Sequence, residues 1–286
     1  MKLITLVTLL FLGLNASAQG LEYEISNDGE VSFSFNEDFI QKKKIQCIDY
    51  KFSSKRPNRI IKPQIHNTKK VCFTKEGKLK TLNSVLHILN ARIEEDIKCL
   101  YRNGELYQRI EKDAVGYYSE FYTYSSDTCY INIYRGDIYS GSSYGSQDST
   151  LMTSKATVTT NKSLKELNSQ NIEIKSTLFE YDSLGLLQRE LTKYSLSPAR
   201  VDKRYTYNEN GQVSNLSIAT IQNTKNFKFI YDRLSSLKSI EYYLEDKLVS
   251  TYEIVYNSNG WVSALLKHDL TSQLIEIEEL EYSFYK

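Results

Sequence analysis

Apolar and aromatic side chains recur in the C-terminal half of the chain in short alternating runs, each followed by a polar turn. The last aromatic residue of each run is Tyr181, Tyr207, Tyr231 or Tyr256, at intervals of 26, 24 and 25 residues. Because alternate residues of a strand share one face, each run predicts a strand with a column of large side chains. A period near 25 residues suits two strands and two short turns, so we expect an antiparallel meander of tandem β-hairpins.

The residues that follow each tyrosine are typical of a tight turn. Gly185, Gly211 and Gly260 stand four positions after their tyrosines and can adopt positive φ without a Cβ clash, while Ser235 takes this place in the third unit. An Asp or Asn directly after each tyrosine can accept hydrogen bonds from backbone N–H groups of the turn. The returning strands then begin with Leu187, Val213, Leu237 and Val262.

This motif resembles the YD repeat of RHS-type proteins: Tyr-Asp or Tyr-Asn, two variable residues, Gly, one variable residue, then Leu or Val. The resemblance covers residues 178–265. It implies hairpin architecture, since long arrays in that family wrap into a closed β shell that can enclose a toxin domain, and shorter arrays occur in secreted bacterial proteins. Leu186, Gln212 and Trp261 replace the Arg that often follows the turn glycine. With so few clear repeats, we expect one curved or partly rolled all-β sheet, and the resemblance implies no activity.

The first 18 residues have the pattern of a secretory signal peptide. Lys2 precedes an uncharged run over residues 3–14, and Ala16-Ser17-Ala18 forms a cleavage site. This run is shorter than the ~20 residues that a membrane-spanning helix needs. Charged residues also interrupt the strands expected of a lipid-facing barrel: Arg189, Lys193, Lys238, Glu241 and Lys267. We therefore predict export to the periplasm, cell surface or medium of a bacterium, with no transmembrane span in the mature chain.

The N-terminal half carries weaker copies of the hairpin pattern. Turn signals occur at Asn27-Asp28-Gly29, at Gly77 and at Asn103-Gly104. Residues 82–97 fit either an amphipathic helix or two strands, and the 27-residue gap between the last two turn glycines favours strands. We expect an N-terminal β region over residues 19–160, a candidate linker at 161–171 and a C-terminal repeat region over 172–286, forming one domain or two.

All four cysteines lie in the N-terminal half, at intervals close to the repeat period. Cys47, Cys72, Cys99 and Cys129 are candidates for disulfides in an exported protein, with three pairings open. Equivalent positions on successive hairpins are about 9–10 Å apart, which exceeds the Cα separation a disulfide allows. Either the sheet is irregular there or the thiols are free. The spacing of His and Cys predicts no metal site, and no cofactor motif is present.

Two segments are candidate binding surfaces. Residues 42–80 hold thirteen Lys and Arg, beginning with Lys42, Lys43 and Lys44, and form either a solvated face or a patch for an anionic glycan. Residues 116–150 are rich in Tyr, Ser and Gly, and Tyr139 and Tyr144 there could stack on sugar rings. The alternative for this second segment is an aromatic strand pair followed by a flexible Ser/Gly loop.

The composition supports a folded β protein, with 23 Tyr, 11 Phe and a formal net charge of +1. We predict a non-catalytic binding or structural module of the bacterial cell envelope, which contacts a glycan or a protein partner and no nucleic acid. The alternative is an envelope-polymer hydrolase, which would need carboxylates, or His and Ser, converging in a pocket. No sequence motif strongly indicates such a site, and oligomeric state is left open.

Overall fold

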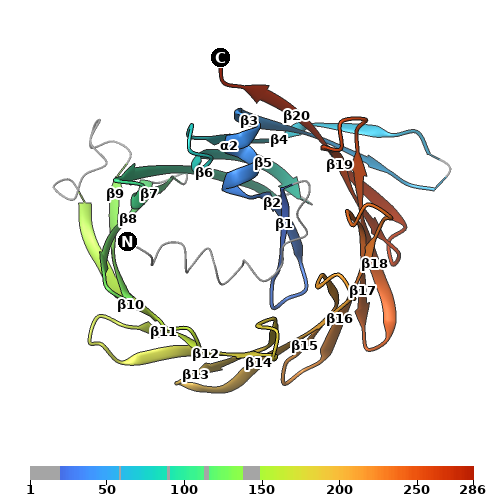
Figure 1. Ribbon diagram of the computed structural model, residues 1–286. Helices are drawn as coiled ribbons and strands as arrows, with labels where there is room; N and C mark the ends of the chain where they lie inside the picture. The colour runs from blue at the N-terminus through green and yellow to red at the C-terminus, as the bar shows by residue number, and fades with distance from the viewer. Residues whose placement is uncertain (1–19, 58, 89–90, 113–115, 138–148) are drawn as a thin grey trace.

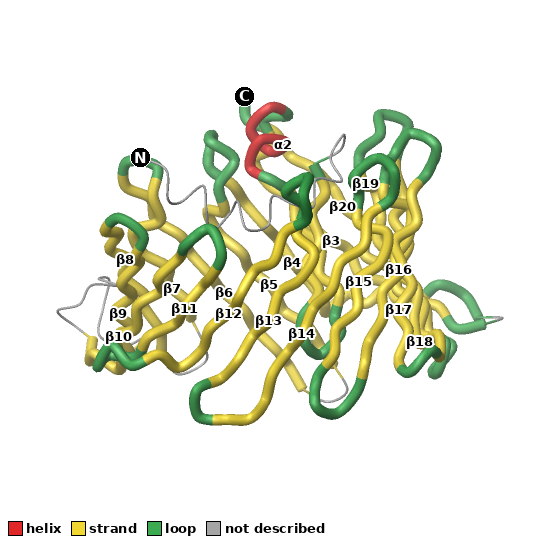
Figure 2. Tube along the Cα trace, turned by 60° about the horizontal axis from the view of Figure 1, so that its bottom comes forward, coloured by secondary structure: helices red, strands yellow, loops and turns green. Residues whose placement is uncertain are grey.

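A computed structural model describes residues 20–57, 59–88, 91–112, 116–137 and 149–286 of the protein. Strands β3 to β20 pair in chain order, each antiparallel to the next, and β20 pairs with β3 to close an 18-stranded barrel. Strands β1 and β2 form a separate two-stranded sheet that lies inside the ring of the barrel (Figure 1), and helix α2 lies at one end of the barrel (Figure 2). The hairpin turns gather at the two ends of the barrel (Figure 2).

The bounds of the elements follow the chain. The internal elements are β1 (Leu21–Ile25), β2 (Val31–Phe35) and α2 (Glu37–Lys42). The strands of the barrel are β3 (Ile45–Lys55), β4 (Lys62–Phe73), β5 (Leu79–Ile88), β6 (Ala91–Arg102), β7 (Glu105–Lys112), β8 (Gly116–Ser125), β9 (Thr128–Asp137), β10 (Ser149–Thr159), β11 (Ser163–Leu167), β12 (Glu173–Tyr181), β13 (Leu187–Tyr194), β14 (Ser197–Tyr207), β15 (Val213–Ala219), β16 (Thr224–Tyr231), β17 (Leu237–Leu244), β18 (Lys247–Tyr256), β19 (Val262–Asp269) and β20 (Leu274–Phe284).

The antiparallel meander is confirmed, and the prediction of an open, partly rolled sheet was wrong. The clear repeats alone are too few for closure, but the N-terminal half adds strands β3 to β10 with a similar hairpin period. The described residues of the 82–97 segment fall in two of these strands, β5 and β6. The candidate linker at 161–171 contains β11, which pairs with both β10 and β12, so the two predicted regions share one sheet.

The repeat turns have the predicted geometry. Gly185, Gly211 and Gly260 have φ between 73° and 82°, and Ser235 has φ 63°. In each turn the Asp or Asn side chain accepts two backbone N–H groups; Asp232 Oδ1 binds Leu234 N at 2.8 Å and Ser236 N at 2.9 Å. One side chain thus satisfies two donors that the turn removes from the sheet ladder.

The tyrosines of the repeat link neighbouring hairpins, a role that the sequence pattern had not indicated. Tyr231 Oη donates to Val213 O at 2.9 Å, and Tyr256 Oη donates to Leu237 O at 2.7 Å. Tyr207 and Tyr282 make the same bond to the first residue of the preceding returning strand. A tyrosine hydrogen bond therefore joins each of these four hairpins to the one before it.

The inner face of the barrel is identified by its contacts with the internal hairpin. Lys203 Nζ donates to Ile25 O at 3.0 Å, and Lys225 Nζ donates to Asn27 O at 2.7 Å. By strand alternation, Tyr205 and Phe229 share this inner face and are buried in the main apolar core. The core therefore lies between the internal elements and one side of the barrel wall.

The outer face is charged and extensively paired. Arg189 binds Asp202 through two hydrogen bonds of 2.8 Å and also contacts Glu180 at 3.1 Å. Asp49 and Lys70 form a similar outer pair on β3 and β4. The hydrogen bonds from Arg189 and Arg204 hold the pKa of Asp202 below its ordinary value. No helix among the described residues is long and apolar enough to cross a membrane.

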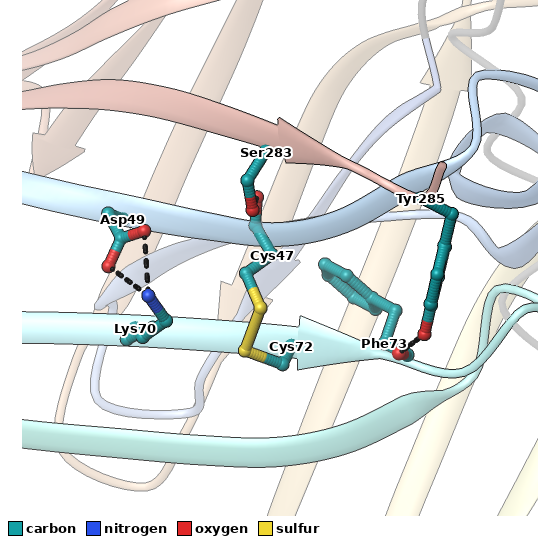
Figure 3. Close-up of a disulfide and its surroundings, with 7 residues drawn as sticks. All are labelled: Cys47, Asp49, Lys70, Cys72, Phe73, Ser283 and Tyr285. Atoms are coloured by element: carbon teal, nitrogen blue, oxygen red, sulfur yellow. Dashed lines mark hydrogen bonds and ion pairs between the residues drawn. A yellow bond between two sulfur atoms is a disulfide. The ribbon is translucent and has the colours of Figure 1, made fainter.

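One disulfide joins two neighbouring strands. Cys47 on β3 pairs directly with Cys72 on β4, with a Cα–Cα distance of 4.0 Å (Figure 3). The expected separation of 9–10 Å was wrong for this pair, because it assumed cysteines on successive hairpins, two strands apart. Cys47 and Cys72 instead lie opposite each other on the two adjacent strands of one hairpin. Cys99 and Cys129 carry free thiols.

Candidate functional site

The internal hairpin has one apolar face and one polar face. Leu21, Tyr23 and Ile25 alternate along β1 and are buried against the barrel wall, where the Tyr23 ring lies 4.8 Å from that of Phe229. The intervening Glu22 pairs in register with Ser34 of β2. Because strand neighbours point to opposite faces, the polar face is directed away from this wall. The alternate apolar side chains of β1 therefore hold the hairpin against the wall, and the polar side chains between them stay within the barrel.

Helix α2 follows the hairpin and is held by three contacts. Asn36 caps its first turn, with Oδ1 accepting Phe39 N at 2.8 Å. Phe39 packs edge-on against Trp261, with ring centroids 6.0 Å apart. At the other contact, a Cβ built on Gly77 would lie 2.1 Å from Glu37 O, so the β4–β5 turn packs directly on the start of α2.

A cavity of about 710 Å³ lies between these internal elements and the wall formed by β3 to β5. Its apolar side includes the rings of Phe33, Phe35, Tyr50 and Phe73. Its polar lining comes from three acidic and two basic side chains with Ser34 and Asn36 between them: Glu22, Glu37, Asp38, Lys69 and Lys78. Gly77 and Gly104 also line it, which places the cavity at the same end of the barrel as α2.

Two carboxyl groups of the cavity have perturbed acidity. Burial raises the pKa of Glu22 above its ordinary value, and the negative charge of Glu37 raises it further. Burial also raises the pKa of Glu37; the Lys78 ammonium partly opposes this shift and Asp38 adds to it. On the neighbouring wall, burial raises the pKa of Glu278, partly offset by Lys69. Glu22 is half-buried and Glu37 is exposed at the cavity, and two carboxyls that line one cavity can bind hydroxyl groups or transfer a proton.

The side of the barrel beyond β5 has a polar inner face. Arg109 shares the inner face with Ile97 through the register of β6 and β7, and it contacts Glu111 at 2.8 Å and Glu120 at 3.6 Å. Further round, Lys175 and Glu166 pair at 2.7 Å. These charges neutralise one another within a strand and across adjacent strands, which suits a wall that faces water.

The structure separates the predicted binding residues. Lys42, Lys43 and Lys44 are exposed at the end of α2, where Lys43 Nζ lies 5.7 Å from the Trp261 ring centroid. The rest of the basic segment divides between both faces of the sheet: Lys69 lines the cavity, whereas Lys70 pairs with Asp49 outside. The segment therefore forms no single basic face. Tyr139 and Tyr144 lie outside the described residues, as does the predicted signal peptide over residues 1–18.

The remaining sequence candidates form no cluster in the described structure. Cys99 is buried on β6 and Cys129 lies on β9, and burial raises the pKa of both thiols, that of Cys129 to about 11. Within the described ranges, no group of three or more His, Cys, Asp or Glu side chains could hold a metal ion.

The cavity residues on the internal elements were missed by sequence reasoning. Glu22 and Glu37 stand among many acidic residues with no spacing that marks them. Asn36 followed by two acidic residues is a helix-start signal, and it could have located α2. No local signal indicates that the hairpin lies inside the barrel and the helix at one of its ends.

Comparison with known proteins gives no family. No family model matches the chain, and no curated protein matches its sequence. Among solved structures, a porin-like protein from Bacteroides uniformis is 10% identical with a TM-score of 0.39, covering 84% of this chain and 98% of that one. A porin-like protein from Bacteroides vulgatus is 11% identical with a TM-score of 0.26, covering 82% and 97%. The TcdB2–TccC3 structure is 9% identical with a TM-score of 0.34, covering 87% of this chain and 14% of that one. All three scores are below 0.5, so the description of the barrel depends on its own strand pairing.

Proposed function

We propose that this protein is a non-catalytic, exported binding module of the bacterial cell envelope that holds a glycan in the cavity between its internal hairpin and the β3–β5 wall. The observation that carries the proposal is the combination of aromatic rings and carboxyl groups in this cavity. Aromatic rings pack on the apolar faces of sugars, while carboxylate and amide oxygens accept their hydroxyl groups. The size also fits, since small-molecule sites measure about 300–1,000 Å³.

Two further features support an exported, water-facing barrel. The outer strand faces carry ion pairs such as Arg189–Asp202, which are compatible with water and costly in a lipid-facing band. The Cys47–Cys72 disulfide suits an oxidising compartment outside the cytoplasm. The turn and strand pattern that resembles YD repeats belongs in this proposal as architecture, with no activity attached to it.

Titration of the mature chain with soluble envelope oligosaccharides, measured by calorimetry, tests the proposal. Ser34 is exposed and lines the cavity, so Ser34→Trp fills the site without entering the core. We expect this variant to weaken binding at least tenfold. Ser32 occupies the same face of the same strand and is not among the lining residues, so Ser32→Trp should bind as the wild type does. Absence of binding to every oligosaccharide tested, or equal loss in both variants, would contradict the proposal.

The same titration covers the tyrosines predicted from sequence. Tyr139 and Tyr144 stay predicted contributors to glycan binding, and the double variant Tyr139→Ala, Tyr144→Ala is expected to weaken it. Unchanged binding in this variant would show that Tyr139 and Tyr144 do not contribute and would confine the site to the cavity.

A second candidate function, hydrolysis of an envelope polymer, rests on Glu22 and Glu37. Glycosidases use two carboxyl groups, one protonated and one ionised, on either side of the bond they cleave. Glu22 and Glu37 line the same cavity, and this pairing of two carboxyl groups favours a glycosidase over other enzyme classes. Release of reducing ends from cell-wall glycan, abolished in Glu22→Gln and in Glu37→Gln, would establish the hydrolase; binding without release would leave the binding module.

A further inference from the structure

The β3–β4 hairpin extends beyond the outline of the barrel and ends in two exposed isoleucines. Figure 1 shows this hairpin projecting outward from the ring. At its tip, Ile60 is 88% exposed and Ile61 is 50% exposed. Before Thr68, β4 has no register with β5, whereas β3 stays paired with β20 up to Lys55, so the turn between β3 and β4 projects from the edge of the wall. Adjacent exposed isoleucines on a projecting turn gain nothing from folding and indicate a contact surface.

Four cations flank these isoleucines. Lys55, Arg56 and Arg59 precede them, and Lys62 follows, all with exposed side chains. No carboxylate of the described residues lies within ion-pair distance of any of these cations. The tip thus combines a short apolar projection with an unneutralised cluster of positive charge. This is the combination by which peripheral proteins contact an anionic lipid surface, with apolar side chains among the headgroups and cations near the phosphates.

The end of the barrel that carries this hairpin has further exposed aliphatic side chains. In an antiparallel meander the turns alternate between the two ends, and the β3–β4 turn shares its end with the β11–β12, β13–β14, β15–β16, β17–β18 and β19–β20 turns. All but one of these carry an exposed aliphatic residue: Ile172, Leu196, Ile221 and Leu270. The exception, the β17–β18 turn, carries Glu245 and Asp246. Because the β3–β4 tip combines exposed aliphatic side chains with four cations, the contact is centred on this tip.

We infer that the β3–β4 tip docks the barrel on an anionic phospholipid surface, with Ile60 and Ile61 entering the headgroup layer and the four flanking cations binding lipid phosphates. The cavity opens at the other end, beside α2, so docking leaves its mouth directed away from the lipid. This inference is independent of what the cavity binds.

Flotation of the mature chain with vesicles tests the inference. We expect binding to vesicles of phosphatidylcholine with phosphatidylglycerol, weaker binding to phosphatidylcholine alone, and a decrease with added salt. The variant Ile60→Ser, Ile61→Ser should weaken binding to the anionic vesicles at least tenfold. The variant Arg56→Gln, Arg59→Gln should weaken it on the order of 25-fold, from about 1 kcal/mol per cation and 1.4 kcal/mol per tenfold change.

The matched control uses equally exposed leucines at the opposite end. Leu184 and Leu234 are 83% and 79% exposed, in the β12–β13 and β16–β17 turns, and Leu184→Ser, Leu234→Ser should bind the anionic vesicles as the wild type does. Circular dichroism checks that all variants keep the fold. Absence of wild-type binding to anionic vesicles at low salt, or equal loss in the control, would overturn the inference. Retention of full binding by the isoleucine variant would also overturn it, and would leave the tip as a contact for a protein.

Discussion

The Asp or Asn that follows each repeat tyrosine controls its turn, and the residue three positions later absorbs the positive φ. Gly211 and Ser235 occupy this place in two successive units, with φ of 73° and 63°. A Cβ on Gly211 would meet no atom within 4 Å, so the difference between the two positions is conformational and not steric. The cost of a side chain in the left-handed region can therefore be measured in isolation.

We predict opposite effects on stability for a matched pair of substitutions at these positions. Ser235→Gly should raise the free energy of unfolding by about 0.5–1 kcal/mol, and Gly211→Ser should lower it by about 1 kcal/mol. Urea denaturation of the mature chain provides the measurement. A loss of stability in Ser235→Gly would show that the serine side chain contributes more to the turn than its strain costs.

The raised pKa of Glu22 gives a second prediction at this scale. A carboxyl whose pKa is higher in the folded state than in the unfolded state contributes stability below its ordinary value of 4.5, and this contribution is lost as pH rises through the folded value. Glu22→Gln should therefore increase stability at pH 7, with the gain disappearing at acidic pH. Glu24 is exposed on the same strand, and Glu24→Gln should change stability little at either pH. A gain in stability that is the same at both pH values would show that the raised pKa of Glu22 is not its cause.

At the scale of elements, α2 is positioned by contacts from two distant parts of the barrel. Its first turn packs on Gly77 of the β4–β5 turn, and Phe39 and Lys43 contact the ring of Trp261. Trp261 is the single tryptophan of the chain, so its fluorescence reports directly on the position of α2. The contact with Gly77 depends on the absence of a side chain there.

We predict that Gly77→Ala displaces α2 and shifts the emission of Trp261 to longer wavelength. Gly104 has a similar positive φ, 82° against 86° for Gly77, and a Cβ there meets no atom within 4 Å. Gly104→Ala therefore carries the same backbone strain without the clash, and its emission should match that of the wild type. Equal spectra for all three proteins would show that the helix does not depend on this contact.

At the scale of the whole molecule, local sequence patterns predict the hairpins but not the barrel. The alternation and the turns around Gly185 or Gly260 are local, so the antiparallel meander follows from them. Closure requires β20 to pair with β3, which joins residues more than 200 positions apart and has no local signature. The hairpin at Asn27-Asp28-Gly29 was predicted, whereas its place inside the barrel depends on contacts such as Tyr23 with Phe229. The cavity forms only once the barrel is closed and the hairpin is packed inside it, which is why its residues were not identified from sequence.

The central claim is that residues 20–42 pack against the inner wall and one end of a closed barrel, and hydrogen exchange of the mature chain tests it most directly. A two-stranded hairpin and a six-residue helix are marginal in water on their own, so their amides would exchange rapidly if they lay outside the barrel. We predict that the hydrogen-bonded amides of β1 and β2 exchange as slowly as those of the barrel strands β14 to β18. Exchange of residues 20–42 at the rate of a free peptide, with the barrel strands protected, would contradict the account.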